Sequence, residues 1–229
     1  YIVKTIVTTE TIKTIAEQNG FKMYDCYTGF KWIASVIREN EGKARYIGGG
    51  EESYGFLPED FVRDKDSVSS ISLMAEIAAW AKDKGMTMYQ MLQDIYIKYG
   101  YSKEKGISVV RKGKSGAEEI VAMMKNFREN PMKELGGSPV ILIKDYASLE
   151  ATDMVNGTKS KLDMPVTSNV LQYFSADGSK VSIRPSGTEP KIKFYIEVRG
   201  IKMDNYADYD AANAAADAKI EAIKKELGI

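Results

Sequence analysis

The first hundred residues alternate between short apolar runs rich in β-branched residues and segments with apolar positions at helical spacing. The first helix, for example, carries Ile12, Ile15 and Ala16 on one face and ends at Gly20. Strands and helices in alternation predict βαβ units around a mostly parallel sheet. The expected elements are strands at 1–7, 21–24 and 44–47, a helix capped by Thr8 or Thr9, a second helix after Gly29, and a glycine-rich loop at 48–55.

Two longer helices are predicted at 67–84 and 87–100. Their methionine and tyrosine stripes are typical of a helix core, so we assign them no chemistry. The short charged segment 100–106, which glycines bound on both sides, predicts a domain boundary. We therefore expect one domain at 1–105 and a second at 106–229.

The second domain shows a different order of elements, in which strands dominate and Ala176-Asp177-Gly178 is a strong hairpin-turn signal. This order predicts an α+β domain with an antiparallel sheet and helices on one face. The expected strands are 107–110, 140–143, 170–174, 180–183 and 191–198, the expected helices are 116–130 and 208–227, and 147–169 is a long polar stretch.

Composition limits the classes of function. The 229 residues include 32 Lys plus Arg and 32 Asp plus Glu, so no overall field favours nucleic acid or a membrane surface, and any anion site must be local. The sequence has one cysteine, no long apolar run and no signal peptide before the first strand, which together predict a cytoplasmic protein. Because the sequence enters directly with a β-rich run, we expect residues 1–7 to be an internal strand of a larger protein. Histidine is absent, so an acid or base must be Lys, Tyr, Asp or Glu.

A candidate phosphate site lies in the turn Arg184-Pro185-Ser186-Gly187-Thr188, between two predicted strands. Arginine presents a planar fork to phosphate oxygens, Ser186 and Thr188 add hydroxyl donors, and Gly187 lets backbone N–H groups approach an anion. Lys193, in the following strand, is a candidate second cation. The alternative for these residues alone is an ordinary polar turn.

A candidate sugar site lies in Gly50-Glu51-Glu52-Ser53-Tyr54-Gly55, which follows a predicted strand as ligand loops in α/β sheets do. In an extended backbone Glu51 and Ser53 point the same way and could hold neighbouring sugar hydroxyls, whereas Glu52 faces elsewhere. A solvated acidic turn is the alternative.

These motifs, together with Thr28-Gly29-Phe30-Lys31 and Arg63-Asp64-Lys65-Asp66, occur in the order seen in the α-D-phosphohexomutases. The chain resembles the third and fourth domains of that family, and most of all its phosphoglucomutase branch. The resemblance implies a three-layer αβα domain followed by a domain similar to the TATA-box-binding-protein fold. It also implies reversible phosphate transfer between the C1 and C6 oxygens of a hexose through a bisphosphorylated sugar.

Carried over by motif, Glu51 and Ser53 are similar to the family's sugar-binding pair, and Thr28, Gly29 and Lys31 to residues that line the same cleft. The resemblance implies that Lys65 acts as a general acid or base. It also implies that the non-reacting phosphate is bound by Arg184, Ser186, Gly187, Thr188 and Lys193.

The family's phosphorylatable serine loop and its Asp-x-Asp-x-Asp magnesium loop do not occur in this sequence. Mg²⁺ and a hexose 1,6-bisphosphate activator are therefore implied for a longer protein, with no metal assigned to these residues. The expected partners are a hexose phosphate and the missing N-terminal domains, without nucleic acid or membrane. A stand-alone sugar-phosphate-binding module and a mutase of glucosamine or pentose phosphates remain alternatives.

Overall fold

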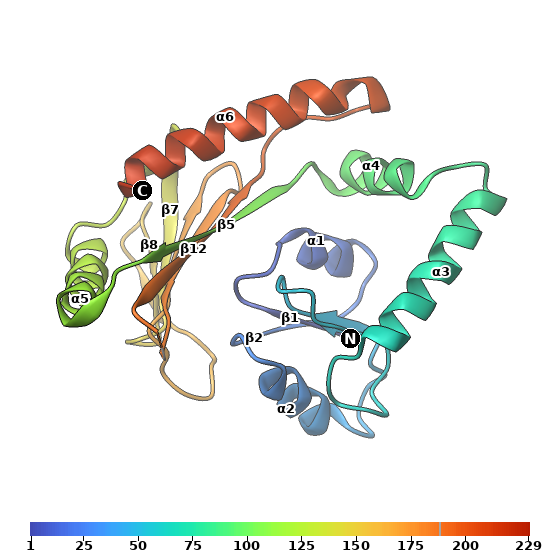
Figure 1. The fold of residues 1–229 in the computed structure, drawn as a ribbon, viewed down its shortest axis with the longest axis horizontal. Helices are drawn as coiled ribbons and strands as arrows, with labels where there is room; N and C mark the ends of the chain where they lie inside the picture. The colour runs from blue at the N-terminus through green and yellow to red at the C-terminus, as the bar shows by residue number, and fades with distance from the viewer. Residues whose placement is uncertain (188) are drawn as a thin grey trace. The chain divides into compact units, whose positions relative to one another are not determined.

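The computed structural model describes residues 1–187 and 189–229 and divides into two compact units. Unit 1 comprises Tyr1–Gly100 with Asp204–Tyr206, and unit 2 comprises Tyr101–Met203 with Ala207–Ile229. Each unit has its own sheet and its own helices (Figure 1).

Unit 1 is built on a four-stranded sheet in the order β2-β1-β3-β4, in which β1 pairs in parallel with both β2 and β3, and β4 runs antiparallel to β3. Helices α1 and α2 lie on opposite sides of this sheet (Figure 1). The expected α/β class with a mostly parallel sheet is confirmed. The elements are β1 (Ile2–Thr5), α1 (Thr11–Gln18), β2 (Met23–Cys26), α2 (Phe30–Asn40), β3 (Gly48–Gly50), β4 (Phe56–Leu57), α3 (Ser67–Asp83) and α4 (Met88–Tyr99).

The third strand of unit 1 does not lie where its sequence pattern predicts. The apolar run 44–47 is not a strand, and β3 is instead formed by the three glycines that we expected to begin a loop. A Cβ atom at Gly49 would lie 2.5 Å from the carbonyl oxygen of Val3, and one at Gly50 would lie 2.6 Å from that of Gly55. The neighbouring backbone therefore lies too close to Gly49 and Gly50 for either to carry a side chain. A run of glycines has no hydrophobic pattern that could predict a strand.

The hydrophobic core of unit 1 lies on the α2 side of the sheet. Three apolar residues of α2, namely Phe30, Ile33 and Ile37, pack there against Val3 and other buried side chains. Buried aromatic and aliphatic groups of this kind supply most of the stabilisation of a small α/β unit. The remaining members of this core are Tyr1, Cys26, Tyr46 and Leu57.

Unit 2 is built on an antiparallel sheet in the order β5-β12-β11-β10-β7-β8-β9, with β6 paired to β7. Helices α5 and α6 cover one face, where Phe194 of β12 meets Phe127 of α5 in an edge-to-face contact. The expected α+β class is confirmed. The elements are β5 (Lys103–Val110), α5 (Gly113–Glu129), β6 (Glu134–Leu135), β7 (Ser138–Asp145), β8 (Glu150–Asp153), β9 (Lys159–Lys161), β10 (Leu171–Ser175), β11 (Lys180–Pro185), β12 (Lys191–Val198), a 3₁₀ turn (Tyr206–Asp208) and α6 (Tyr209–Leu227).

The polar stretch 147–169 contains two strands that its pattern did not indicate. Strand β8 pairs with β7, and β9 pairs with β8 at the end of the sheet. All three residues of β9 are exposed, so this edge strand contains no apolar side chains that could have predicted it.

The predicted hairpin turn joins β10 to β11, with Gly178 at a φ of 86°. The ammonium group of Lys219 in α6 forms an ion pair with the carboxylate of Asp177 in this turn. Burial disfavours the charged carboxylate, but hydrogen bonds from Lys219 and Ser175 outweigh it and lower the pKa of Asp177 to about 2. The turn is therefore tied to the helix layer of unit 2.

Candidate functional site

The loop between β3 and β4 is a closed, bent connection. The N–H of Glu51 donates to the carbonyl oxygen of Gly55 at 2.7 Å, which brings the two ends of the loop together. The carboxylate of Glu51 accepts from the N–H of Gly29 at 2.5 Å, at the start of α2. A negative charge is favoured at a helix N-terminus, so this bond both orients Glu51 and joins two of the predicted sugar-site segments.

Glu52 and Ser53 face a different part of unit 1. The hydroxyl of Ser53 donates to Glu52 Oε1 at 2.9 Å. Glu52 Oε2 accepts from the hydroxyls of Thr5 and Thr8 at 3.2 and 3.3 Å, just after β1. Ser53 thus contacts Glu52 instead of pointing alongside Glu51, because the loop is bent and its side chains do not alternate as they would in an extended backbone. Sequence reasoning missed the anchoring contacts of Glu52, which no local motif indicates.

Lys65 lies beside the same loop. A Cβ atom placed at Gly55 would lie 2.9 Å from Lys65 Cδ, 3.1 Å from the Phe30 ring and 3.2 Å from Glu51 Oε2. The Lys65 ammonium lies 5.0 Å from the centre of the Phe30 ring, within range of a cation–π contact. The structure therefore brings Glu51, Gly29 and Lys65 together around Gly55.

The other two predicted residues of this site flank the start of α2. Thr28 is half-buried immediately before Gly29, whose φ of 113° is a conformation that residues with a side chain rarely adopt. Lys31 is exposed on the first turn of α2, with its ammonium 5.2 Å from the Trp32 ring. Both lie next to the Glu51–Gly29 contact in the chain.

An ion cluster around a buried lysine supports the edge of this site. Lys4 of β1 is fully buried, and its ammonium lies 2.7 Å from Asp25 of β2 and 3.0 Å from Glu10. Burial alone would lower the pKa of Lys4, but the two carboxylates outweigh it and raise the pKa above its usual value. The cluster joins β1, β2 and the start of α1, so the strand end that carries Thr5 is held in place.

The predicted phosphate turn lies between β11 and β12. Arg184 and Lys193 are directly opposite each other across these strands, so both side chains lie on the same face of the sheet. Within residues 1–187 and 189–229, no carboxylate pairs with either cation. Like charges placed opposite each other destabilise a strand pair, and an anion bound between them would remove that repulsion.

Two hydrogen bonds from backbone N–H groups hold the turn. The N–H of Ser186 donates to the carbonyl oxygen of Lys191 at 2.8 Å, and that of Glu189 to the Ser186 hydroxyl at 3.3 Å. Gly187 is exposed, and a Cβ atom there would meet nothing within 4 Å. Thr188 lies outside the described residues. The turn therefore keeps open space beside the backbone of Gly187, next to the opposed cations.

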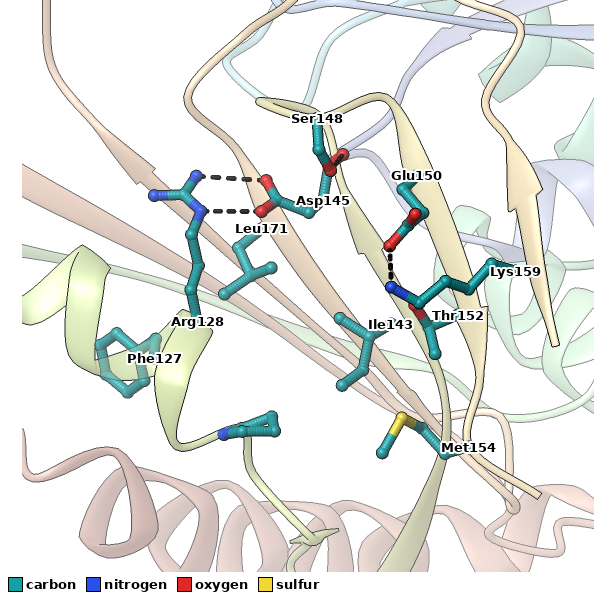
Figure 2. Close-up of a pocket in the computed structure, with 11 residues that line it drawn as sticks. Phe127, Arg128, Ile143, Asp145, Ser148, Glu150, Thr152, Met154, Lys159 and Leu171 are labelled. Atoms are coloured by element: carbon teal, nitrogen blue, oxygen red, sulfur yellow. Dashed lines mark hydrogen bonds and ion pairs between the residues drawn. The ribbon is translucent and has the colours of Figure 1, made fainter. Parts of the chain in front are cut away.

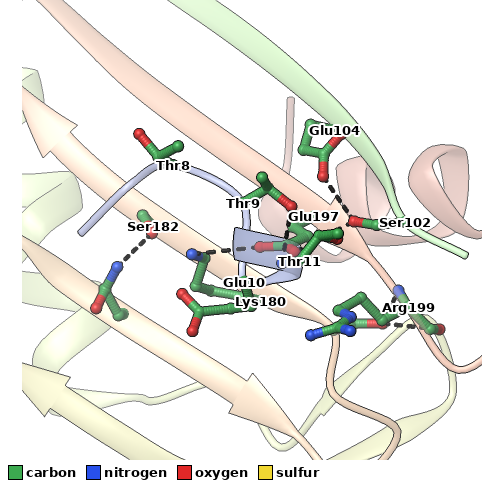
Figure 3. A network of polar contacts seen from close by, with 12 residues as sticks. Thr8, Thr9, Glu10, Thr11, Ser102, Glu104, Lys180, Ser182, Glu197 and Arg199 are labelled. Carbon is green, nitrogen blue, oxygen red and sulfur yellow. Dashed lines mark hydrogen bonds and ion pairs between the residues drawn. The ribbon is translucent and has the colours of Figure 1, made fainter. Parts of the chain in front are cut away.

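Buried polar contacts fix the strands that carry this turn, and Figure 3 labels two of the side chains that make them, Lys180 and Glu197. Because alternate side chains of a strand lie on the same face, Lys180 and Glu197 share the sheet face of Arg184 and Lys193. The ammonium of Lys180 in β11 lies 3.3 Å from Glu197 of β12, and both side chains are buried. Ser102 Oγ lies 3.2 Å from Glu197 Oε1 and 2.6 Å from Glu104 Oε1. These contacts position the two cation-bearing strands without using Arg184 or Lys193.

A cavity of about 320 Å³ lies beside the end of α5 in unit 2 (Figure 2). Its polar groups are already engaged: Arg128 makes two bonds to Asp145 at 2.8 and 3.2 Å, and Lys159 pairs with Glu150 at 2.8 Å. Its floor is apolar, with Leu171 and other carbon side chains. This cavity is therefore a poor candidate for an anion site.

In the part of the chain that the structure describes, no group of three or more acidic or cysteine side chains is arranged to hold a metal ion, so these residues do not fit a magnesium centre of their own. No helix there combines the length and the apolar character that crossing a bilayer requires.

The described residues thus provide a candidate site for hydroxyl groups in the loop of unit 1 and a candidate anion site at the opposed cation pair of unit 2. Residues 1–99 match the family model described as phosphoglucomutase/phosphomannomutase, alpha/beta/alpha domain III. Residues 141–202 match the model described as phosphoglucomutase/phosphomannomutase, C-terminal domain. The chain belongs to the phosphoglucomutase/phosphomannomutase family, and the predicted resemblance is confirmed.

Individual relatives agree with this assignment. A phosphoglucomutase of Staphylococcus aureus strain MRSA252 is 37% identical over 206 residues, which are 90% of this chain and 37% of the relative. A phosphoglucomutase of Staphylococcus haemolyticus is 33% identical over 205 residues, 90% of this chain and 36% of the relative. The chain thus spans little more than a third of the length of these relatives.

A solved structure supports the fold. The open form of pp63/parafusin, a phosphoglucomutase from Paramecium, superposes on this chain with a TM-score of 0.60 at 20% sequence identity. The superposition covers 100% of this chain and 38% of the parafusin chain. At that level of identity, the likeness concerns the fold alone.

Proposed function

We propose that this chain is the substrate-binding C-terminal part of a phosphoglucomutase or phosphomannomutase that interconverts hexose 1-phosphate and hexose 6-phosphate. In this proposal unit 1 binds the sugar hydroxyls and unit 2 binds the phosphate that does not react. The observation that carries it is the opposition of Arg184 and Lys193 without a carboxylate partner in the described residues. A phosphate dianion would neutralise both cations and reach the open backbone at Gly187.

Glu51 is the proposed hydroxyl acceptor in unit 1. Its Oε1 is used by the Gly29 N–H, which leaves Oε2, beside Gly55, to accept from a sugar hydroxyl. The hydroxyl of Ser53 donates to Glu52, and its lone pairs remain available as acceptors. Thr28, Gly29 and Lys31 border the same space in this proposal.

Lys65 is the proposed proton-transfer group. It is the cationic side chain beside Glu51 and Gly55, and the sequence contains no histidine that could take the part. The phosphoserine that accepts and returns the phosphate, the Mg²⁺ ion that assists it and the bisphosphorylated sugar belong, in this proposal, to the longer protein. Binding energy from the distal phosphate and the sugar hydroxyls would orient the reacting oxygen in that protein.

Activity of the isolated chain tests the division of roles. Because no residue of this chain is assigned to phosphate transfer, we expect no interconversion of glucose 1-phosphate and glucose 6-phosphate in a coupled assay. We expect glucose 6-phosphate to bind nevertheless, as measured by isothermal titration calorimetry. Turnover by the isolated chain, or absence of phosphosugar binding to a folded chain, would contradict the proposal.

Two variants test the two binding regions separately. Arg184→Ala should weaken binding of both inorganic phosphate and glucose 6-phosphate by about 1.5–3 kcal/mol, because it removes a charged donor. Glu51→Gln should weaken glucose 6-phosphate binding and leave inorganic phosphate binding unchanged. Arg111→Ala is a matched control, since its guanidinium already pairs with Glu119 at 3.2 Å. Equal effects of Glu51→Gln on both ligands would exclude Glu51 as a reader of hydroxyls.

A further inference from the structure

The carboxylate of Glu52 is surrounded by hydroxyl groups. The Ser53 hydroxyl donates to its Oε1 at 2.9 Å, and the hydroxyls of Thr5 and Thr8 lie 3.2 and 3.3 Å from its Oε2. An ionised carboxylate can only accept hydrogen bonds, so the proton in each bond comes from the hydroxyl. Bonds of this charged kind are roughly twice as strong as bonds between neutral groups. Glu52 therefore determines the direction in which the Ser53 proton points.

The two threonines hold Glu52 against the end of β1. Thr5 is the last residue of that strand and is fully buried, and the N–H of Thr8 donates to the Thr5 carbonyl oxygen at 3.0 Å. Their hydroxyls lie 2.8 Å apart, and when one donates to the other, the proton of the accepting threonine is left for Glu52. Glu52 is itself exposed, but it is bound to a strand that pairs with neighbours on both sides. Its position is therefore fixed by the sheet as well as by the loop.

The loop that carries these residues is held in an unusual conformation. Tyr54 has a φ of 64°, in the left-handed region that residues with a side chain rarely adopt. Its ring is fully exposed, so packing of the ring does not account for this conformation. Strained backbone persists where surrounding contacts fix it, and it is concentrated at binding sites. The bond from the Glu51 N–H to the Gly55 carbonyl oxygen and the contacts of Glu52 supply that constraint.

Glu51 and Ser53 are left as hydrogen-bond acceptors. Glu51 Oε1 accepts from the Gly29 N–H, and Oε2 lies beside Gly55 with lone pairs to offer. The Ser53 oxygen also keeps its lone pairs, while its one proton is directed at Glu52. A ligand hydroxyl that meets either atom must therefore donate its own proton.

We propose that Glu52 is a positioning residue of the sugar site, which fixes the Ser53 hydroxyl as an acceptor and makes the loop selective for ligands with two hydroxyl donors. This inference rests on the proposed function, in which Glu51 and Ser53 bind the sugar. Glu52 acts through Ser53, because both of its oxygens already accept from hydroxyls of the protein. The selected ligands are phosphorylated sugars with two free hydroxyls. A fluorine or an ether oxygen at either position can accept but cannot donate, so such a sugar is rejected.

The first measurement is the affinity of the 229-residue chain for fluorinated ligands. Glucose 6-phosphate is compared, by isothermal titration calorimetry, with analogues that carry fluorine in place of the hydroxyl at C2, C3 or C4. Two of the three analogues should bind about tenfold more weakly or worse, because each loses a donated hydrogen bond. The third should bind like glucose 6-phosphate. Equal affinity for all four ligands would overturn the proposal.

Glu52→Gln tests the positioning role itself. The amide nitrogen of glutamine can donate to the Ser53 oxygen, and the Ser53 proton is then free to turn towards the ligand. The penalty for fluorine at one of the two sensitive positions should therefore fall from about tenfold to about threefold or less, while the penalty at the Glu51 position is unchanged. A merely structural role of Glu52 would weaken all the ligands by one common factor. That result, or an unchanged selectivity, would overturn the proposal.

Two further variants serve as controls. Glu39→Gln is the matched one, since Glu39 also accepts from a serine hydroxyl, that of Ser35 at 3.4 Å, on the exposed side of α2. It should leave every affinity unchanged. Ser53→Ala should abolish the fluorine penalty at the position that Glu52→Gln affects, and Glu52→Gln should have little further effect on selectivity in that background. A full effect of Glu52→Gln without the Ser53 hydroxyl would show that Glu52 does not act through Ser53.

The same titrations keep this inference apart from the proposed function. Absence of glucose 6-phosphate binding to the folded, unsubstituted chain would contradict the proposed function and this inference with it. Binding of glucose 6-phosphate without selectivity between hydroxyl and fluorine would leave the proposed function standing and overturn the role of Glu52 alone.

Discussion

Glu51 and Glu52 are neighbours in the chain, yet their carboxylates lie in different surroundings. Glu51 accepts from the Gly29 N–H at the start of α2, whereas Glu52 accepts from hydroxyls that follow β1. Sequence chemistry could identify acids and hydroxyls in a glycine-bounded loop, since residue types alone indicate what a loop could bind. It could not assign partners, because Thr5 and Thr8 are more than 40 residues away from Glu52.

Gly187 allows the binding role of the phosphate turn to be separated from its structural role. Gly187→Ala should leave the free energy of unfolding within about 0.5 kcal/mol of the original, because its Cβ atom would enter open space. Inorganic phosphate binding should weaken by about 1 kcal/mol or more, since the methyl group would occupy space beside the backbone donors. Titration calorimetry and urea unfolding measure the two effects, and unchanged phosphate affinity would remove Gly187 from the site.

Cys26 offers a test of the α2-side core. Burial, with a smaller effect of Asp25, raises the pKa of its thiol to about 12. At pH 8 the folded chain should therefore react with Ellman's reagent far more slowly than a free thiol, because thiolate is the reactive form. The same chain in guanidinium should react fully and quickly. Fast labelling without denaturant would show that this side of unit 1 opens readily.

At the scale of elements, helices were the easier part to predict from sequence. Helix α4 begins where Thr87 and Gln90 form a capping box, and it ends at Gly100. The start of α3 was shifted by one position, since Asp66 and not Ser67 accepts the first N–H groups. The position of strand β3 was predicted wrongly. Its residues are glycines because the neighbouring backbone leaves no room for side chains, and a hydrophobic pattern reports only side chains that are buried.

Gly49 provides the corresponding test of an element. Gly49→Ala should destabilise unit 1 by about 1–3 kcal/mol, because its Cβ atom would lie 2.5 Å from the Val3 carbonyl oxygen and 2.7 Å from the Tyr46 hydroxyl. Gly106→Ala in β5 is the matched control, since nothing lies within 4 Å of the added atom. Chemical denaturation compares the two variants, and equal stability would contradict the close approach of β1 and β3.

At the scale of the whole molecule, the change in hydrophobic pattern after residue 100 predicted two kinds of sheet, and both are present. Fold class could be predicted because periodicity reports which face of an element is buried. The clustering of residues within each candidate site could not be predicted, because it depends on the register in which strands pair. Arg184 lies opposite Lys193 only because β11 and β12 pair in the observed register.

The two units should unfold in separable transitions, because each has its own core. Both tryptophans, Trp32 and Trp80, belong to unit 1, so tryptophan fluorescence reports that unit while far-ultraviolet circular dichroism reports both. Gly49→Ala should lower the fluorescence midpoint. Asp177→Asn removes the ion pair with Lys219 in unit 2. It should therefore lower the midpoint of a transition seen by circular dichroism and leave the fluorescence midpoint unchanged. Identical shifts in both signals for both variants would show that the units unfold as one.

The order of strands in unit 2 has a consequence for how the chain is made. Strand β5, the first of that unit, pairs along its whole length with β12, the last strand of the chain. Synthesis on the ribosome proceeds from the N-terminus at about 5–20 residues per second, and contacts between distant residues slow folding. The sheet of unit 2 therefore cannot be completed until Val198, the last residue of β12, has left the ribosome. All strands of unit 1, in contrast, are available once Leu57 has left it. The turn that bears Arg184 is accordingly among the last parts of the chain to reach its native form.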